Sequence, residues 1–283
     1  MRSRWGDAAL LGAAFFYGTT FVVVQDAVDE AAPSAFLAAR FAVATAALAP
    51  FALARRRPTI TPNLWRDAAL AAGTMAAGYA LQTVGLQYTT SSRSAFITYL
   101  LVVMVPVMAA VTIRRAPTTR VMVAVAVAAC GLVLLTDVSG GGFGRGELLT
   151  LGCAAAFAAN VVVIAAVIEH HDALLLTFVQ LAMLALIFSV PGQIQGGYGF
   201  ETSTWIGVVF TGVFASALAF SLQNWGQRTV GPSRAAILLV MEPVFAAAIA
   251  WIDGERLGAA ALVGAMLIIV AVLISELSPS NAA

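Results

Sequence analysis

Two charged side chains lie deep inside apolar stretches of this sequence, and they are the residues best suited to chemistry. Glu242 stands beside Pro243 in one apolar segment, and Arg40 lies about seven residues into another. An ionisable group held away from water needs a partner or a function. A buried carboxylate can exchange a proton, and a guanidinium can bind a carboxylate on a solute through two parallel hydrogen bonds. The pair suggests recognition of a charged solute, coupled to protons if Glu242 titrates.

Each of these residues also has a structural interpretation that the sequence leaves open. Glu242 could be an anchor bonded to a helix end or to an arginine near the membrane surface. Arg40 could extend its side chain to the surface, or it could pair with Asp26, Asp29 or Glu30. The positions of the two residues in their segments predict that they lie toward opposite membrane faces.

Uncharged polar residues inside the apolar segments form a second group of candidates. A buried tyrosine carries an apolar ring and a hydroxyl that needs a partner, which suits a cavity for small amphipathic solutes. The alternative for such residues is packing, or an inter-helix hydrogen bond that contributes around 1 kcal/mol. Gln223 and Asn224, near the end of their segment, are interpreted as interfacial. The predicted substrate-binding residues are Tyr17, Thr20, Arg40, Tyr79, Tyr99 and Asn160.

The composition defines the elements that must position these residues. Hydrophobic residues make up 61% of the 283 positions, charged residues make up 10%, and the mean hydropathy is +0.92. A soluble domain carries about 25% charged residues, so most of this surface must face lipid. Unbroken apolar runs near 20 residues predict membrane-spanning helices rather than the alternating strands of a barrel. The ten predicted spans are residues 7–25, 34–53, 67–87, 94–113, 119–136, 147–168, 173–191, 203–225, 234–252 and 257–275.

The arginines predict the orientation of these spans. With the amino terminus in the cytoplasm, the inner loops hold eleven arginines and the outer loops hold three, namely Arg93, Arg145 and Arg256. Positive residues gather on the cytoplasmic side of membrane proteins. We therefore expect a multi-pass protein of the plasma membrane, the inner membrane of a bacterium, with both termini in the cytoplasm.

The two halves of the sequence match each other at an offset of 140 residues. Asp7 corresponds to Glu147, and Trp65 corresponds to Trp205. We expect a first repeat over residues 1–138, a glycine-rich linker over 139–146 and a second repeat over 147–283. Five helices in each repeat place the second copy upside down relative to the first. Inverted repeats are common in secondary transporters, because exchanging the conformations of the halves opens the site to the other side.

Two short motifs in the second half extend this interpretation. Residues 242–246 read Glu-Pro-Val-Phe-Ala, and residues 254–258 read Gly-Glu-Arg-Leu-Gly. With five-plus-five helices and an apolar-Gly-x-x-Phe first segment, the chain resembles the EamA-like family of the drug/metabolite transporter superfamily over nearly its whole length. The resemblance implies a ten-helix bundle with a central cavity that exports amino acids and other small metabolites. The first half departs from the motif, since Val105 precedes Pro106 where the second half has Glu242.

The remaining features exclude other classes or leave them weak. A net charge of +1 gives no case for nucleic acid binding, and no nucleotide-binding or metalloprotease motif is present. We expect no cofactor and no metal site, and we interpret His170-His171-Asp172 as a solvated loop. The leading hypothesis is a secondary transporter that lies in the lipid bilayer as a monomer or homodimer. Its substrate is a small molecule. The alternatives are a membrane scaffold or receptor without transport, and less favoured, an intramembrane enzyme.

Overall fold

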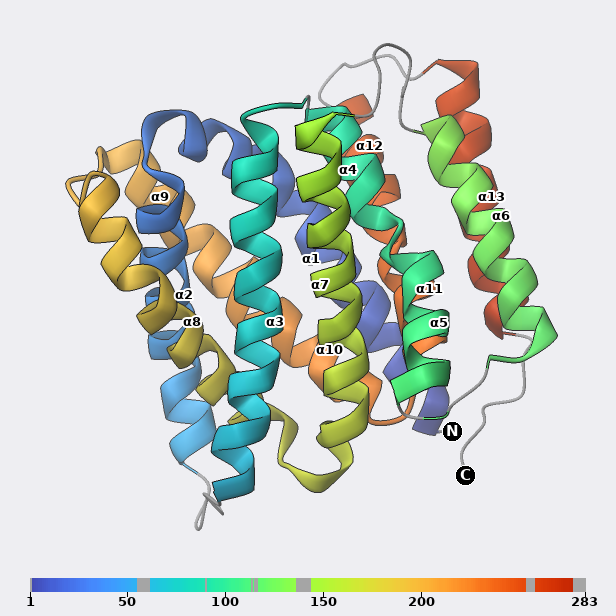
Figure 1. The fold of residues 1–283 in the computed structure, drawn as a ribbon, viewed down its shortest axis with the longest axis horizontal. Helices are drawn as coiled ribbons and strands as arrows, with labels where there is room; N and C mark the ends of the chain where they lie inside the picture. Colours follow the sequence, from blue (N-terminus) through green and yellow to red (C-terminus); the bar gives the residue numbers. More distant parts are fainter. Residues whose placement is uncertain are drawn as a thin grey trace.

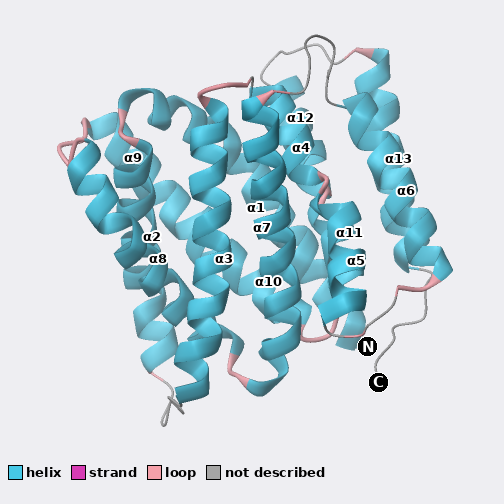
Figure 2. Cartoon of the chain, viewed as in Figure 1, coloured by secondary structure: helices cyan, strands magenta, loops and turns pink. Residues whose placement is uncertain are grey.

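The computed structural model describes residues 2–54, 62–89, 91–112, 114, 117–135, 144–252 and 258–276. Within these ranges it leaves out the side chains of residues 2–3, 20–30, 91–93, 250 and 276. The described part of the chain is an all-helical bundle without strands, and short turns join many of its helices (Figure 2). Most of the predicted linker lies outside the described residues, because residues 139–143 are not described. Residues 254–257 of the second motif also lie outside them.

The first half folds into spans that agree closely with the apolar segments of the sequence. A membrane-spanning helix needs about 20 apolar residues, because a helix rises 1.5 Å per residue and the hydrocarbon core is about 30 Å thick. The helices of this half are α1 (Arg2–Glu30), α2 (Pro33–Leu53), α3 (Pro62–Leu86), α4 (Ser91–Tyr99), α5 (Leu101–Thr112) and α6 (Thr119–Leu135).

The second half repeats this order of elements. Asp172 begins one of its helices as an N-cap, with its side chain accepting hydrogen bonds from the backbone N–H groups of Leu174 and Leu175. The elements of this half are α7 (Arg145–Val167), a short 3₁₀ turn (Ile168–His170), α8 (Ala173–Gln195), α9 (Thr202–Thr211), a π-helical segment (Gly212–Leu218), α10 (Ala219–Gln227), α11 (Pro232–Leu239), α12 (Met241–Ile252) and α13 (Ala259–Glu276).

The corresponding spans of the two halves are both interrupted. A single residue, Leu100, separates α4 from α5, and a single residue, Val240, separates α11 from α12. Each break lies a few residues before the proline that the two spans share, Pro106 or Pro243. Pro243 has no backbone N–H to offer the preceding turn, which explains the break before it. Counting interrupted helices as one span, the described residues form ten spans in two inverted sets of five.

Six of the described helices are long and apolar enough, by length and composition alone, to cross a membrane. The helices α6 and α13 are shorter and also apolar. Many large apolar side chains on the outside of the bundle are exposed, including Val111, Leu186 and Ile194, as expected for a surface that faces lipid. The protein is therefore a polytopic membrane protein.

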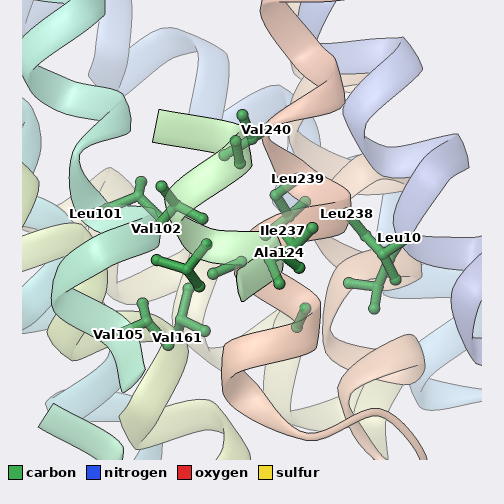
Figure 3. Packing of buried hydrophobic residues seen from close by; sticks show 14 of the residues in the cluster. Leu10, Leu101, Val102, Val105, Ala124, Val161, Ile237, Leu238, Leu239 and Val240 are labelled. Carbon is green, nitrogen blue, oxygen red and sulfur yellow. The ribbon is translucent and has the colours of Figure 1, made fainter. Parts of the chain in front are cut away.

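The largest apolar cluster lies toward the face of the membrane at which α1 begins, which we call the N-terminal face. Leu10 of α1, Val105 of α5 and Ile237 of α11 are buried in this cluster, together with Val161 of α7 (Figure 3). The cluster draws residues from both halves, so it joins them. Packed side chains therefore fill this half of the bundle between its central helices.

The pair formed by α6 and α13 lies at one edge of the bundle, with the two helices side by side (Figure 1). Gly131 and Gly264 allow their backbones to approach closely. A Cβ atom added to Gly131 would lie 2.7 Å from the carbonyl oxygen of Gly264, nearer than real Cβ contacts. Small residues at a helix crossing are typical of helix association in membranes, where no hydrophobic force holds helices together.

We expect Gly131→Ala to destabilise the protein by about 1–3 kcal/mol, the usual effect of overpacking. Gly73 is the matched control, because an added Cβ there meets no atom within 4 Å. Gly73→Ala should be neutral or stabilising by up to about 1 kcal/mol, since alanine favours a helix over glycine. Unfolding of both variants in detergent measures the difference, and equal stability would contradict the role of the crossing.

Candidate functional site

A cavity of about 230 Å³ lies at the middle of the bundle between the two halves. Its walls come from α1, α2, α3, α4 and α5 of the first half and from α7, α10, α11 and α12 of the second. The lining side chains are partly polar and partly apolar. The polar ones are Tyr17, Arg40, Tyr79, Gln82, Thr98, Tyr99, Asn160, Gln223 and Glu242. The larger apolar ones are Met75, Leu101, Phe157, Val161, Phe220, Leu239 and Val240.

The cavity brings together six of the seven side chains that the sequence singles out. The six are Tyr17, Arg40, Tyr79, Tyr99, Asn160 and Glu242. The seventh, Thr20, has a side chain outside the described residues. These residues come from six different helices, so the arrangement depends on the packing of the whole bundle. Their shared position makes the cavity the candidate site.

Arg40 and Glu242 line the same cavity, so the expectation that they lie toward opposite membrane faces is wrong. Arg40 is 5% exposed, so the alternative in which its side chain extends to the surface is also wrong. The alternative of an ion pair with Asp26, Asp29 or Glu30 involves side chains outside the described residues. A cation and a carboxylate therefore line one cavity inside the bundle, where charges interact more strongly than in water.

Hydrogen bonds inside the cavity join the two halves. Tyr17 Oη donates to Gln223 Oε1 at 2.8 Å, from α1 to α10. Asn160 Nδ2 donates to the carbonyl oxygen of Ala71 at 2.8 Å and to Thr74 Oγ1 at 3.2 Å, from α7 to α3. Asn160 thus fixes the position of α7 against α3 as well as lining the cavity.

The sequence predicts that the two amides of α10 are interfacial, and this prediction is wrong. Gln223 is 5% exposed and Asn224 is 2% exposed, so both are buried. Gln223 lines the cavity, whereas Asn224 Nδ2 donates to Thr177 Oγ1 and to Gln180 Oε1 on α8. Thr98 and Gln82 are further lining residues that the sequence analysis did not select. Their only signal in the sequence is polarity within an apolar run.

Polar links between helices hold the N-terminal face closed below the cavity, and the ion pair among them joins the two halves. Arg234 Nη2 on α11 pairs with Asp7 Oδ2 on α1 at 2.8 Å, and both side chains are largely buried. Gln227 Nε2 on α10 donates to the carbonyl oxygen of Val161 on α7 at 2.9 Å. These links lie on the same side of the cavity as the apolar cluster of Figure 3. The described structure therefore has a packed N-terminal face and a cavity nearer the middle.

The interpretation of the His170-His171-Asp172 segment as a solvated loop is wrong for His171. Its Nε2 lies 2.7 Å from Asp67 Oδ2 on α3, and the two side chains are 7% and 5% exposed. Asp67 Oδ1 also accepts a hydrogen bond from Arg66 Nε at 2.9 Å. His171 thus ties the α7–α8 connection of the second half to the first half. Among the described residues, no group of three potential metal ligands is found.

We expect His171→Ala to lower the free energy of unfolding by about 1–3 kcal/mol, because it leaves a buried carboxylate oxygen of Asp67 without its partner. His170 is exposed, so His170→Ala is the matched control and should change stability by less than about 0.5 kcal/mol. Chemical unfolding of the two variants in the same detergent makes the comparison. Similar losses for both histidines would show that the link to Asp67 contributes nothing.

Two inverted sets of five helices around a cavity lined from both sets are typical of secondary transporters. The comparison with protein families agrees with this class. The chain belongs to the EamA-like transporter family, whose model matches residues 4–137 and again residues 144–277. The family points to a transporter rather than to an enzyme.

Two individual proteins are similar to the chain over nearly its whole length. An uncharacterized transporter of Archaeoglobus fulgidus is 32% identical over 284 residues, which cover 98% of this chain and 87% of the relative. A crystal structure of a protein 17% identical in sequence superposes with a TM-score of 0.81 and covers 96% of both chains. The second similarity supports the fold alone.

Proposed function

We propose that the protein is a secondary transporter that exports small metabolites, either amino acids or amphipathic solutes, by alternating access. The cavity is the substrate site, and Tyr17, Thr20, Tyr79, Tyr99, Asn160 and Arg40 bind the substrate. The observation that carries the proposal is that both halves contribute walls to one cavity of mixed polarity. A rearrangement of one half against the other then changes the walls of the site itself.

The proposed mechanism uses the closed N-terminal face. In the present state the apolar cluster and the Asp7–Arg234 pair block passage at that face. Because the two halves are inverted repeats, exchange of their conformations closes the opposite face and opens this one. Glu242 supplies coupling to protons in this scheme, since it is a carboxylate inside the cavity. The substrate gradient is the driving force otherwise.

The proposal includes the place of the protein in the cell. We place both termini in the cytoplasm of a cell with the chain in its plasma membrane, which follows from the eleven arginines of the inner loops against three in the outer loops. The N-terminal face is then the cytoplasmic face. Residues 1–138 and 147–283 are the two repeat units, joined by residues 139–146, as the two family matches support.

Counterflow in proteoliposomes tests this function. Protein reconstituted with an internal pool of an unlabelled amino acid or amphipathic cation should accumulate the labelled form, and empty liposomes should not. Asn160→Leu removes the polar wall and is expected to abolish counterflow, whereas Trp251→Leu, on the exposed surface, should retain it. Absence of flux across the whole panel would favour a scaffold or receptor without transport.

A further inference from the structure

The π-helical segment Gly212–Leu218 is the most unusual stretch of backbone among the described spans. π-Helical turns are rare within α-helices and frequently occur at functional sites. This one interrupts the span between α9 and α10 and packs against α2. A Cβ atom on Gly212 would lie 2.9 Å from the carbonyl oxygen of Arg40, so glycine permits this close approach. The segment is thus pressed against the turn of α2 that carries Arg40.

Within this segment, Ser216 makes a specific contact with that arginine. Arg40 Nε donates to Ser216 Oγ at 2.7 Å, and both residues are buried. Arg40 lines the cavity and Ser216 does not. A bond at Nε fixes the plane of the guanidinium and leaves its two terminal nitrogens, which are the donors that grip a carboxylate side by side. Ser216 therefore orients Arg40 from behind the cavity wall.

Arg40 forms no direct ion pair with a described carboxylate, although Glu242 lines the same cavity. The ion pairs of the fold instead join Asp7 with Arg234 and Asp67 with Arg66 and His171. Tyr79, which lines the same cavity, is a neutral neighbour. Because no described carboxylate contacts the guanidinium directly, its charge favours an anionic group of the substrate in the cavity that it lines.

We propose that Ser216 is a positioning residue that aims Arg40 at the carboxylate of the substrate, so that the cavity selects small monocarboxylates with an apolar body. The proposal rests on the proposed function, because it assigns a substrate class to the same cavity. The size of the body follows from the volume. A protein cavity of about 150 Å³ can hold benzene, so about 230 Å³ has room for one ring and a carboxylate. Met75, Phe157 and Phe220 supply the apolar walls.

Binding of three matched probes to the protein in lipid nanodiscs tests this inference. Phenylacetate, phenylacetamide and phenethylamine share one ring and differ in whether their head group is anionic, neutral or cationic. Isothermal titration should show phenylacetate binding about ten- to hundredfold more tightly than phenylacetamide, the ratio expected for hydrogen bonds to a charged group. Arg40→Gln should remove this preference.

The variants of Ser216 separate positioning from simple destabilisation. Ser216→Ala should weaken phenylacetate binding about fivefold or more while leaving phenylacetamide unchanged, and Ser216→Thr, which keeps the hydroxyl, should restore the preference. Ser221→Ala is the matched control, because Ser221 Oγ donates to the carbonyl oxygen of Ala217 one turn earlier and not to Arg40. That variant should bind like the wild type.

The inference is overturned if the three probes bind equally, if phenylacetate does not bind, or if Ser216→Ala weakens all probes alike. Binding in nanodiscs needs no transport, so its outcome is independent of the counterflow assay. Loss of the carboxylate preference with intact counterflow rejects the substrate class alone. Intact preference without counterflow of any solute rejects the transport function alone.

Discussion

Replacing Asp7 with alanine is expected to lower the free energy of unfolding by about 3–5 kcal/mol, because it leaves Arg234 as a buried cation without its partner. The pair joins α1 to α11 at 2.8 Å, and the side chains of Arg234 and Asp7 are 13% and 7% exposed. An exposed ion pair contributes about 0–1 kcal/mol, so burial accounts for the size of the effect. Unfolding of the purified variant in mixed detergent micelles measures the loss.

The matched control removes the charge of Arg234 together with that of Asp7, so that no unpaired charge stays buried. The double variant Asp7→Leu with Arg234→Met removes both charges and keeps apolar volume, and its stability should lie within about 1 kcal/mol of the wild type or above it. A loss of less than about 1 kcal/mol for Asp7→Ala would mean that water reaches Arg234. The Asp7–Arg234 pair would then not close the N-terminal face to water.

The pair also links stability to the conformational state. Asp7 belongs to the first half and Arg234 to the second, so opening the N-terminal face must separate them. The repeat equivalent of Asp7 is Glu147, which accepts a hydrogen bond from Thr89 Oγ1 at 2.7 Å and one from the backbone N–H of Gly144 at 2.8 Å. The two carboxylates thus occupy corresponding positions with different partners. This difference is an asymmetry between the two faces that the inverted repeats alone do not produce.

The spans could be predicted from the sequence because a bilayer imposes one length on every helix. The predicted segment 34–53 differs from α2 (Pro33–Leu53) by one residue, and the predicted segment 119–136 begins at the first residue of α6 (Thr119–Leu135). The helix ends that differ more, such as the first residue of α3, extend the apolar run with polar residues that reach beyond the hydrocarbon. Hydropathy measures the apolar run and not the whole helix.

The shared cavity of Arg40 and Glu242 could not be predicted from depth along separate helices. Glu242 is ten residues from each end of the span that begins at Pro232 and ends at Ile252, so it lies at mid-membrane. The predicted span of 234–252 begins two residues later, which places Glu242 nearer the inner end of its helix. A helix rises 1.5 Å per residue, so an error of a few residues shifts the expected depth by several ångströms. A long side chain such as that of Arg40 spans a similar distance, so depth along the helix does not fix where its charge lies.

Partners distant in the sequence account for the other corrections. His171 pairs with Asp67 across 104 positions, and Gln223 pairs with Tyr17 across 206. Each residue has a local context, a polar turn or a helix end, that favours an exposed side chain. Which polar groups meet inside the bundle depends on helix packing, and one sequence carries no direct record of it. The π-helical turn that brings Ser216 to Arg40 likewise has no signal in the apolar pattern of the sequence.

Glu242→Gln is expected to abolish transport driven by a pH gradient while counterflow of the same solute persists. Glutamine keeps the shape of the side chain and can still form hydrogen bonds in the cavity, which Tyr99 also lines. It removes the charge and the exchangeable proton, so a carrier that couples through Glu242 becomes an exchanger. Flux into proteoliposomes with and without an imposed pH gradient measures the two activities separately.

Glu147→Gln is the matched control for this prediction, because Glu147 is a buried carboxylate outside the cavity. It should lower stability without altering the dependence of flux on the pH gradient. Undiminished proton-driven transport by Glu242→Gln would rule out coupling through this residue. The first half offers no substitute, since Val105, the residue before Pro106, is apolar and packed in the cluster at the N-terminal face. Among the described side chains that line the cavity, Glu242 is then the one carboxylate through which the proposed coupling can run.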